Sequence, residues 1–397
     1  MDFMERLSDP SVTKLDLESN IIGDKGATDL AEALKTNKTL TELKLIRNEI
    51  GDTGATALAH AIKENTTLTL LNIRLNRIGV EGANAFAEAL ETNTTLTSLV
   101  LINTRVGVAG ATSLAHALKT KTSSLTSLDL SSNDIGDDGA TALAEALKTN
   151  TSLTSLALVY NQIKVQGASD LAKALETNTS LTSLDLTLNK IGDAGAIQVS
   201  EAIKTNNTLT SLHLSGNKIG DVGATFIATA LRENTSLIRL KLSSNEIGNV
   251  GALSLSAAIR KNNSLETLYL DDNKIGDEAK EDLKAVIDER IFSAVYTSFP
   301  ERLGNRAENL LSSQMFGGNK SLKQLLNGHG NRVLGATSTA GKSSRHVNAL
   351  EIILFKPKSK PKSKPKSKPK SKPKSKPKSK PKSKPKSKPK SKPKKFL

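Results

Sequence analysis

An apolar position recurs along most of this chain at a constant interval, and that interval constrains the fold more than any other feature. Leucine, or valine in the first copy, occupies the position in ten successive copies. The copies begin at Val12, Leu40, Leu68, Leu96, Leu125, Leu153, Leu181, Leu209, Leu237 and Leu265. The step is 28 residues, except for one step of 29 after Leu96. One such unit cannot bury its own apolar side, so neighbouring copies must stack into a solenoid.

Each part of the repeat predicts one piece of this solenoid, as the fifth copy illustrates. Leu128 and Leu130 are two residues apart, so they point to the same side of a short strand. Leu143 and Leu147 are four residues apart and therefore share one face of a helix. Asn133 recurs in every copy but the fourth. Because an amide both donates and accepts, we expect the stacked asparagines to satisfy the backbone where each strand turns.

The ends of the helix are also marked in the repeat. We expect Asp137 to cap its own helix by accepting hydrogen bonds from amides of the first turn. Asn150 is predicted to end the helix in a left-handed conformation, which asparagine tolerates. Three copies replace the capping aspartate by valine, at Val80, Val108 and Val165. We interpret irregular copies in so regular an array as the place where a partner binds.

The Leu-x-x-Leu-x-Leu-x-x-Asn signature resembles the ribonuclease-inhibitor-like leucine-rich repeats, and the resemblance covers about residues 12–295. It implies an α/β solenoid shaped like a horseshoe, with a parallel sheet on the concave face and helices outside. It also implies that partners bind mostly on the concave side. The chain departs from vertebrate inhibitors in having no cysteine. We expect a leucine-rich-repeat domain of ten repeats with a C-terminal cap helix over residues 1–295.

The chain changes character twice after the repeats. Residues 296–355 lose the period and are predicted to be irregular and partly ordered. Residues 356–397 form a Lys-Pro-Lys-Ser repeat tail, in which proline at every fourth position prevents a helix. The tail holds 21 lysines and no acid, so removing it from a net charge of +16 leaves −5. The sequence therefore predicts a mildly acidic body and a disordered basic tail.

The charge of the tail suggests binding to a polyanion, either nucleic acid or an acidic membrane surface. Such binding would be blind to base sequence, because nothing in the tail can stack on or read a base. The first candidate polyanion-binding residues are Lys356, Lys358, Lys360, Lys362 and Lys364. The alternative, a four-residue unit amplified in the gene and tolerated as a solvated extension, stays open.

Side chains that alternate with the strand leucines are expected on the open concave surface. Most of them are small or polar, but apolar exceptions cluster in repeats 2–4 and 6–7. The candidate partner-binding residues are Ile46, Leu70, Leu75, Val100, Ile102, Val159, Tyr160 and Leu188. Contiguous exposed apolar area usually indicates binding. Drift of tolerant positions and self-association through the patch are the alternatives.

The sequence gives little support to catalysis, and we predict no enzyme activity, cofactor, metal site or small-molecule substrate. The five histidines are scattered; His60 and His116 are expected to face solvent, and His213 to stand alone on a concave strand. Metal or acid–base chemistry needs several such groups to converge. Gly341-Lys342-Ser343 ends a relaxed phosphate-loop pattern, but no α/β segment of domain size surrounds it.

The main functional hypothesis is a non-catalytic scaffold or adaptor that binds a protein partner on its concave face. The alternative is a protein associated with nucleic acid or another polyanion and tethered by its basic tail. The amino terminus lacks a basic start and an apolar stretch, so no signal peptide is expected. We therefore expect a cytoplasmic protein, with signal-independent export into a host cell left open.

Overall fold

The computed structural model describes residues 3–120, 123–298 and 351–353. The strands are β1 Lys14–Asp16, β2 Glu42–Lys44, β3 Leu70–Asn72, β4 Ser98–Val100, β5 Ser127–Asp129, β6 Ser155–Ala157, β7 Ser183–Asp185, β8 Ser211–His213, β9 Arg239–Lys241, β10 Thr267–Tyr269 and β11 Glu351–Ile353. The helices are α1 Phe3–Ser8, α2 Gly23–Thr36, α3 Asp52–Glu64, α4 Val80–Leu90, α5 Gly107–Leu118, α6 Gly136–Leu147, α7 Val165–Leu175, α8 Gly192–Thr205, α9 Asp221–Leu231, α10 Asn249–Ile259 and α11 Asp277–Ser298.

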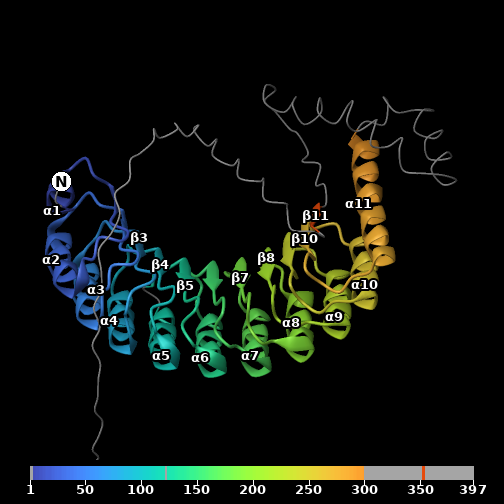
Figure 1. Ribbon diagram of the computed structural model, residues 1–397, viewed down its shortest axis with the longest axis horizontal. Coiled ribbons are helices and arrows are strands. Elements are labelled where there is room, and N and C mark those ends of the chain that lie inside the picture. Colours follow the sequence, from blue (N-terminus) through green and yellow to red (C-terminus); the bar gives the residue numbers. More distant parts are fainter. Residues whose placement is uncertain (1–2, 121–122, 299–350, 354–397) are drawn as a thin grey trace, which may run out of the picture. The chain divides into compact units, whose positions relative to one another are not determined.

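Strand and helix alternate, and the strands form one parallel sheet in sequence order from β1 to β11. The register keeps equivalent residues opposite one another, so Leu128 pairs with Leu99 on one side and with Leu156 on the other. Strands in a sheet lie about 4.8 Å apart, whereas packed helices need 8–10 Å. The stack of repeats therefore curves, with the strands on its inner side and the helices on its outer side (Figure 1). This confirms the predicted solenoid and its parallel inner sheet.

The core lies between the sheet and the helices, and the predicted leucines fill it. Leu128 and Leu130 of the fifth repeat are 1% and 0% exposed, and the helical Leu143 and Leu147 are equally buried. The same positions are buried in the other repeats, so one continuous apolar core runs through the stack. Helix α11 closes that core with the buried Leu283 and then continues to the end of its 22 residues.

The asparagine ladder forms as predicted. The side-chain amide of Asn189 donates to the Leu158 carbonyl of the preceding repeat, 2.9 Å away. Its Oδ1 accepts from the backbone amides of Asn161 and Ile163. Where Thr104 replaces asparagine, its hydroxyl donates to the Leu101 carbonyl of the same repeat instead. The ladder thus ties each turn to the turn of the preceding repeat.

The prediction that Asp137 caps its own helix is wrong, because it caps the helix of the following repeat. Its Oδ1 accepts from the backbone amides of Lys164 and Gly167 at 2.7 and 2.9 Å. Asp24, Asp52, Asp193 and Asp221 make the same pair of hydrogen bonds one repeat ahead. Asp137 and its equivalents lie inside the first turn of their own helices, and the first-turn amides of the next helix lie within hydrogen-bond distance of them.

This arrangement gives the three valine substitutions a structural role. They remove the cap from the next helix, and the glycine that begins that helix then takes a left-handed φ of about +61° to +62°, at Gly107, Gly136 and Gly192. The amide of each glycine donates to the ladder asparagine's carbonyl in the following repeat, at 2.9–3.0 Å. Where aspartate is present, the equivalent Lys164 stays extended. The valine substitutions therefore replace a helix start capped by aspartate with one that begins at a left-handed glycine.

The predicted left-handed conformation at the end of the helix is also wrong. Asn37, Asn65 and Asn206, the equivalents of Asn150, are extended, with ψ of 128–133°. The side chain does the capping. Oδ1 of Asn150 accepts from the amides of Ser152 and Leu153, and its Nδ2 donates to the Leu118 carbonyl of the preceding helix.

Candidate functional site

The inner surface of the sheet is formed by the first and third residues of each three-residue strand. In β4 to β7 the middle leucine is buried and its two neighbours are half-buried. Because the repeats are in register, residues 28 apart form rows that run across the strands. A partner that lies on this surface would contact one row after another.

The eight predicted partner-binding residues divide into three groups by exposure. Tyr160 and Leu188 are exposed, by 61% and 52%. Leu70, Leu75, Val100, Ile102 and Val159 are half-buried. Ile46 is only 7% exposed, so the expectation that it lies open on the surface is wrong. In its row Ile46 stands between Glu18 and Arg74.

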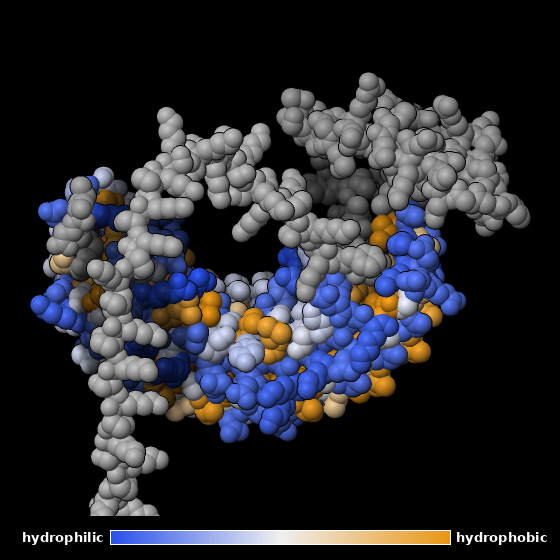
Figure 2. All heavy atoms as spheres, viewed as in Figure 1, coloured by the Kyte–Doolittle hydropathy of each residue, from blue (hydrophilic) through white to orange (hydrophobic). Residues whose placement is uncertain are grey.

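The exposed pair lies on a turn at the end of each strand rather than on the strand itself. Tyr160 and Leu188 have left-handed φ values of +54° and +58°, as does Leu75 at +59°. Leu188 leans over the next repeat, because a Cβ added to Gly216 would lie 2.7 Å from its Cδ2. Bulky side chains at positive φ are unusual. The apolar atoms of the inner rim appear in Figure 2 as separate groups among polar ones.

Two aspartates flank an alanine in one row of repeats 5 to 7, and we call the three residues the carboxylate row: Asp129, Ala157 and Asp185. These residues are in register on β5, β6 and β7. Burial raises the pKa of Asp129 and outweighs the hydrogen bonds from Ser131, with the nearby Asp185 raising it further. Burial acts in the same sense on Asp185, but hydrogen bonds from His213 and Thr187 prevail and lower its pKa.

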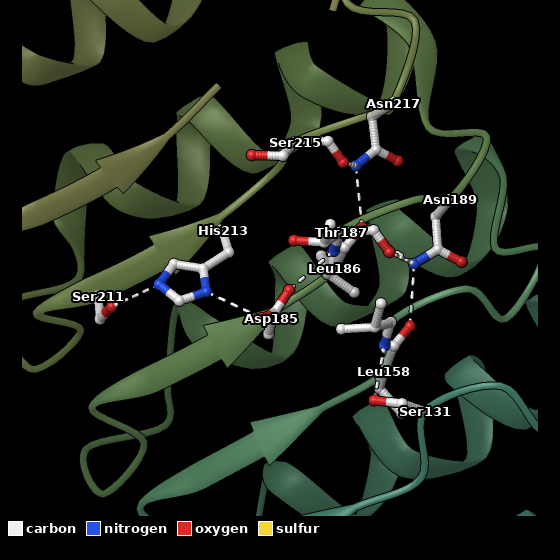
Figure 3. Close-up of polar contacts among 11 residues, drawn as sticks. Ser131, Leu158, Asp185, Leu186, Thr187, Asn189, Ser211, His213, Ser215 and Asn217 are labelled. Atoms are coloured by element: carbon white, nitrogen blue, oxygen red, sulfur yellow. Dashed lines mark hydrogen bonds and ion pairs between the residues drawn. The ribbon is translucent and has the colours of Figure 1, made fainter. Parts of the chain in front are cut away.

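His213 is not alone on its strand, contrary to the prediction. Its Nδ1 lies 2.9 Å from Oδ2 of Asp185, and its Nε2 lies 3.1 Å from the hydroxyl of Ser211 (Figure 3). The order hydroxyl, imidazole, carboxylate is that of a hydrolytic triad. Such a triad also needs free amides to stabilise an oxyanion. The Ser211 amide instead donates to the Thr182 carbonyl, and its side chain is largely buried, so the arrangement supports a fixed polar network.

The outer helices carry an apolar surface that the strand pattern of the sequence did not predict. On α9, Val222 and Phe226 are 54% and 41% exposed, and on α10, Val250 and Leu253 are 63% and 44% exposed. In the fifth repeat the matching positions of Val222 and Val250 hold Asp138. The exchanges are visible in the sequence when equivalent outer positions of the helices are compared between repeats. His60 and His116 lie exposed on outer helices, as predicted.

Several predicted features lie outside the described residues. They are the five tail lysines Lys356, Lys358, Lys360, Lys362 and Lys364, the phosphate-loop-like Gly341-Lys342-Ser343, and most of residues 296–355. The exceptions are residues 296–298, which end α11, and β11, which pairs in parallel with β10. Among helices of the described ranges, none combines the length and apolarity needed to cross a membrane. Nor does that part of the chain hold three histidine, aspartate or glutamate side chains grouped as metal ligands.

Two solved structures show distant likenesses. The structure titled leiomodin-1 actin-binding site 2 is 22% identical, with 46% of this chain and 95% of that chain covered at a TM-score of 0.34. The tropomodulin C-terminal domain from Caenorhabditis elegans is 17% identical, with 39% and 92% covered at a TM-score of 0.33. No curated protein matches the sequence significantly.

The family described as Leucine Rich repeat matches the sequence directly and repeatedly. The matched residues are 8–31, 36–59, 64–87, 122–144, 149–172, 177–200, 205–228, 233–256 and 261–279. These segments follow the 28-residue period and pass over the fourth repeat, which carries Thr104 and Val108. They make up more than half of the chain, and the fold agrees with them. The chain therefore belongs to the leucine-rich-repeat family.

Proposed function

We propose that this protein is a non-catalytic interaction scaffold that binds a protein partner on the inner face of its sheet, around repeats 5 to 7. The observation that carries the proposal is the exposed pair Tyr160 and Leu188 on neighbouring repeats. Glycine occupies the equivalent position at Gly216 and fits its left-handed backbone without strain. Large apolar side chains kept at such positions, open to solvent, serve contact with another molecule better than they serve the fold.

The position of the pair supports binding in a second way. Aromatic and apolar side chains near the centre of an interface supply most of its binding energy. Tyr160 and Leu188 lie in repeats 6 and 7, near the middle of the sheet, with the half-buried Val159 beside them. A partner element that runs along the row of repeats would therefore contact them near its middle.

The test replaces Tyr160 and Leu188 by asparagine in the full-length protein. Asparagine tolerates a left-handed backbone, so the fold should be kept and only the exposed apolar surface lost. Affinity capture from cell extract, followed by measurement of binding to each captured protein, should show at least a tenfold loss. The matched control is Val250→Asn on the outer α10, which also removes an exposed apolar side chain. Loss of binding with the control alone would place the site on the helices.

A second function is favoured by the composition of the tail, which repeats lysine 21 times without an acid. We propose that the tail binds polyanions by charge, releasing counterions as phosphates are neutralised. Replacing its lysines by glutamine in the full-length chain should abolish binding to DNA duplexes of unrelated sequence. Binding by the unaltered protein should fall steeply between 50 and about 200 mM salt. Salt-insensitive binding that survives the replacement would reject this function.

A further inference from the structure

The surface of the carboxylate row is lower in its middle than at its two ends, because Ala157 has a shorter side chain than the aspartates. Asp129 and Asp185 are each in register with Ala157, one on either side of it. Two strand steps separate the carboxylates, a distance of about 10 Å at 4.8 Å per step. The alanine side chain ends at Cβ, so nothing of β6 rises between them in that row. A slender side chain placed over Ala157 would lie about 5 Å from each acid.

The two carboxylates beside Ala157 differ in their basic neighbours, since Asp185 has His213 and Asp129 has no such partner among the described residues. Among the described residues, no lysine or arginine forms an ion pair with Asp129, and Asp185 is paired only with His213. The Arg74 charge acts on Asp129 only at a distance and is outweighed by burial. Burial removes part of the water that hydrates the Asp129 carboxylate, and no cation of the described residues replaces that interaction. A cationic group from outside would therefore be stabilised here.

The spacing of the two acids determines what kind of cation fits. Divalent metal ions bind carboxylate oxygens at about 2.0–2.6 Å, so one ion cannot be shared across about 10 Å. The ammonium or guanidinium group of a lysine or arginine is larger, has several donors and reaches the site on a long apolar stem. An acidic partner would be repelled by both carboxylates.

An apolar contact lies within reach of the same partner. Tyr160 follows Ala157 by three residues, and Leu188 follows Asp185 by three. Three residues span at most about 10 Å, and the chain turns at Tyr160 and Leu188, so the exposed pair lies no more than about 10 Å from the carboxylate row. An extended peptide covers that distance in three residues. One short segment could therefore occupy both places.

We infer that the inner face of repeats 5 to 7 binds a segment of another protein that places a lysine or arginine over Ala157, between Asp129 and Asp185, and an apolar side chain on Tyr160 and Leu188. The inference rests on the proposed scaffold function and specifies its partner. The carboxylates set the sign of the charge and the position of the segment, and the apolar pair supplies contact area. Charge complementarity of this kind determines partner choice and register.

The test selects binders from a display library of random 12-residue peptides, using the full-length protein as bait. Selected peptides should share a lysine or arginine within about three positions of an apolar residue, the spacing that the strand geometry sets. Their affinity should fall about tenfold for Asp129→Asn, which keeps the shape of the side chain and removes its charge. The matched control is Asp138→Asn, an exposed acid on α6 of the same repeat, which should change affinity less than twofold. The peptide Lys-Pro-Lys-Ser-Lys-Pro-Lys-Ser, basic but without an apolar residue, should bind at least tenfold more weakly.

The outcomes separate the inference from the function on which it rests. Peptides that need Tyr160 and Leu188 but show no basic preference, and that bind the Asp129→Asn variant equally, would overturn the inference and leave the scaffold function standing. Peptides that tolerate loss of Tyr160 and Leu188 as well would overturn both. Equal losses of peptide affinity with Asp129→Asn and Asp138→Asn would show that general charge attraction, and not the carboxylate row, binds the basic residue. Failure to select any peptide would also count against the inference.

Discussion

At the scale of single residues, small differences in surroundings give equivalent side chains opposite properties. Asp129 and Asp185 hold the same position in repeats two apart, yet the pKa of the first is raised and that of the second lowered. The difference comes from His213, which lies beside Asp185 and has no counterpart beside Asp129. The two aspartates thus share the same backbone position, and one neighbouring side chain determines whether the pKa of the carboxyl is raised or lowered.

The two aspartates should respond oppositely to substitution by asparagine. A raised pKa means that ionised Asp129 lowers the free energy of unfolding once pH exceeds its unfolded value of about 3.9. Asp129→Asn should therefore raise the melting temperature at pH 7. Asp185 has a lowered pKa, so it stabilises above its unfolded pKa and loses this effect as pH falls through its folded pKa. Asp185→Asn should cost about 1.5–3 kcal/mol at pH 7, the contribution of hydrogen bonds to a charged group. Thermal melts at pH 7 and 3 check both signs, and equal shifts for the two variants would contradict them.

Thr104 interrupts the asparagine ladder, and restoring it should stabilise the protein. In Thr104→Asn, the new amide should donate to the carbonyls of Ile73 and Leu101, as Asn133 donates to those of Leu101 and Leu130. We expect a gain of about 1 kcal/mol in the free energy of unfolding, measured with urea. An unchanged or lower stability would mean that the fourth repeat has adapted its packing to threonine.

At the scale of elements, each helix depends on its neighbour for the start of its first turn. The capping aspartate stands one repeat earlier, so a substitution acts on a helix about 28 residues away in sequence. Where the aspartate is absent, a left-handed glycine replaces the cap. The start of each helix therefore depends on two residues together: the capping residue of the preceding repeat, and the residue at the helix start that does or does not allow a left-handed backbone.

Removing two equivalent caps should therefore have unequal effects. Asp193→Ala frees the amides of Gly220 and Gly223 and should cost about 1 kcal/mol, because Gly220 can adopt the left-handed alternative. Asp137→Ala leaves Lys164 in that position, where a left-handed backbone costs a further 1–2 kcal/mol, roughly. Urea unfolding of both variants measures the difference.

The control for this pair of variants is Lys164→Gly in the Asp137→Ala background. Glycine should recover the additional loss by allowing the left-handed start. If both aspartate variants lose the same stability and glycine has no effect, the two helix starts are not alternatives of one another.

At the scale of the whole repeat domain, every repeat is stabilised by two neighbours except those at the ends. The first is covered by α1 and the last by α11, while β11 extends the sheet beyond β10. Stability in such a stack is close to a sum of repeat and nearest-neighbour terms. A destabilising substitution in a middle repeat therefore weakens the contacts with two neighbouring repeats, and one in a terminal repeat weakens the contacts with one.

Matched core substitutions should reveal this difference. Leu158→Ala in the sixth repeat removes a fully buried side chain and should cost 2–5 kcal/mol, roughly, and weaken the whole domain. Leu17→Ala removes the equivalent side chain of the first repeat and should release mainly that repeat. Amide hydrogen exchange should show faster exchange throughout the domain in the first variant, but only near residues 14–36 in the second. If Leu17→Ala also speeds exchange throughout the domain, the stack unfolds as one unit and the prediction is wrong.

The sequence by itself determined the fold, because apolar periodicity is written residue by residue: a leucine at every strand and helix position of a 28-residue unit admits one buried side and one way of stacking. It also predicted the asparagine ladder, since an amide has donors and an acceptor wherever it stands. Contacts between repeats could not be predicted in the same way. Whether Asp137 caps its own helix or the next, and whether His213 has a partner, depends on groups of the neighbouring repeat that only stacking brings within hydrogen-bond distance. Whether Ile46 is open or covered likewise depends on the packed surface and not on its own residue type.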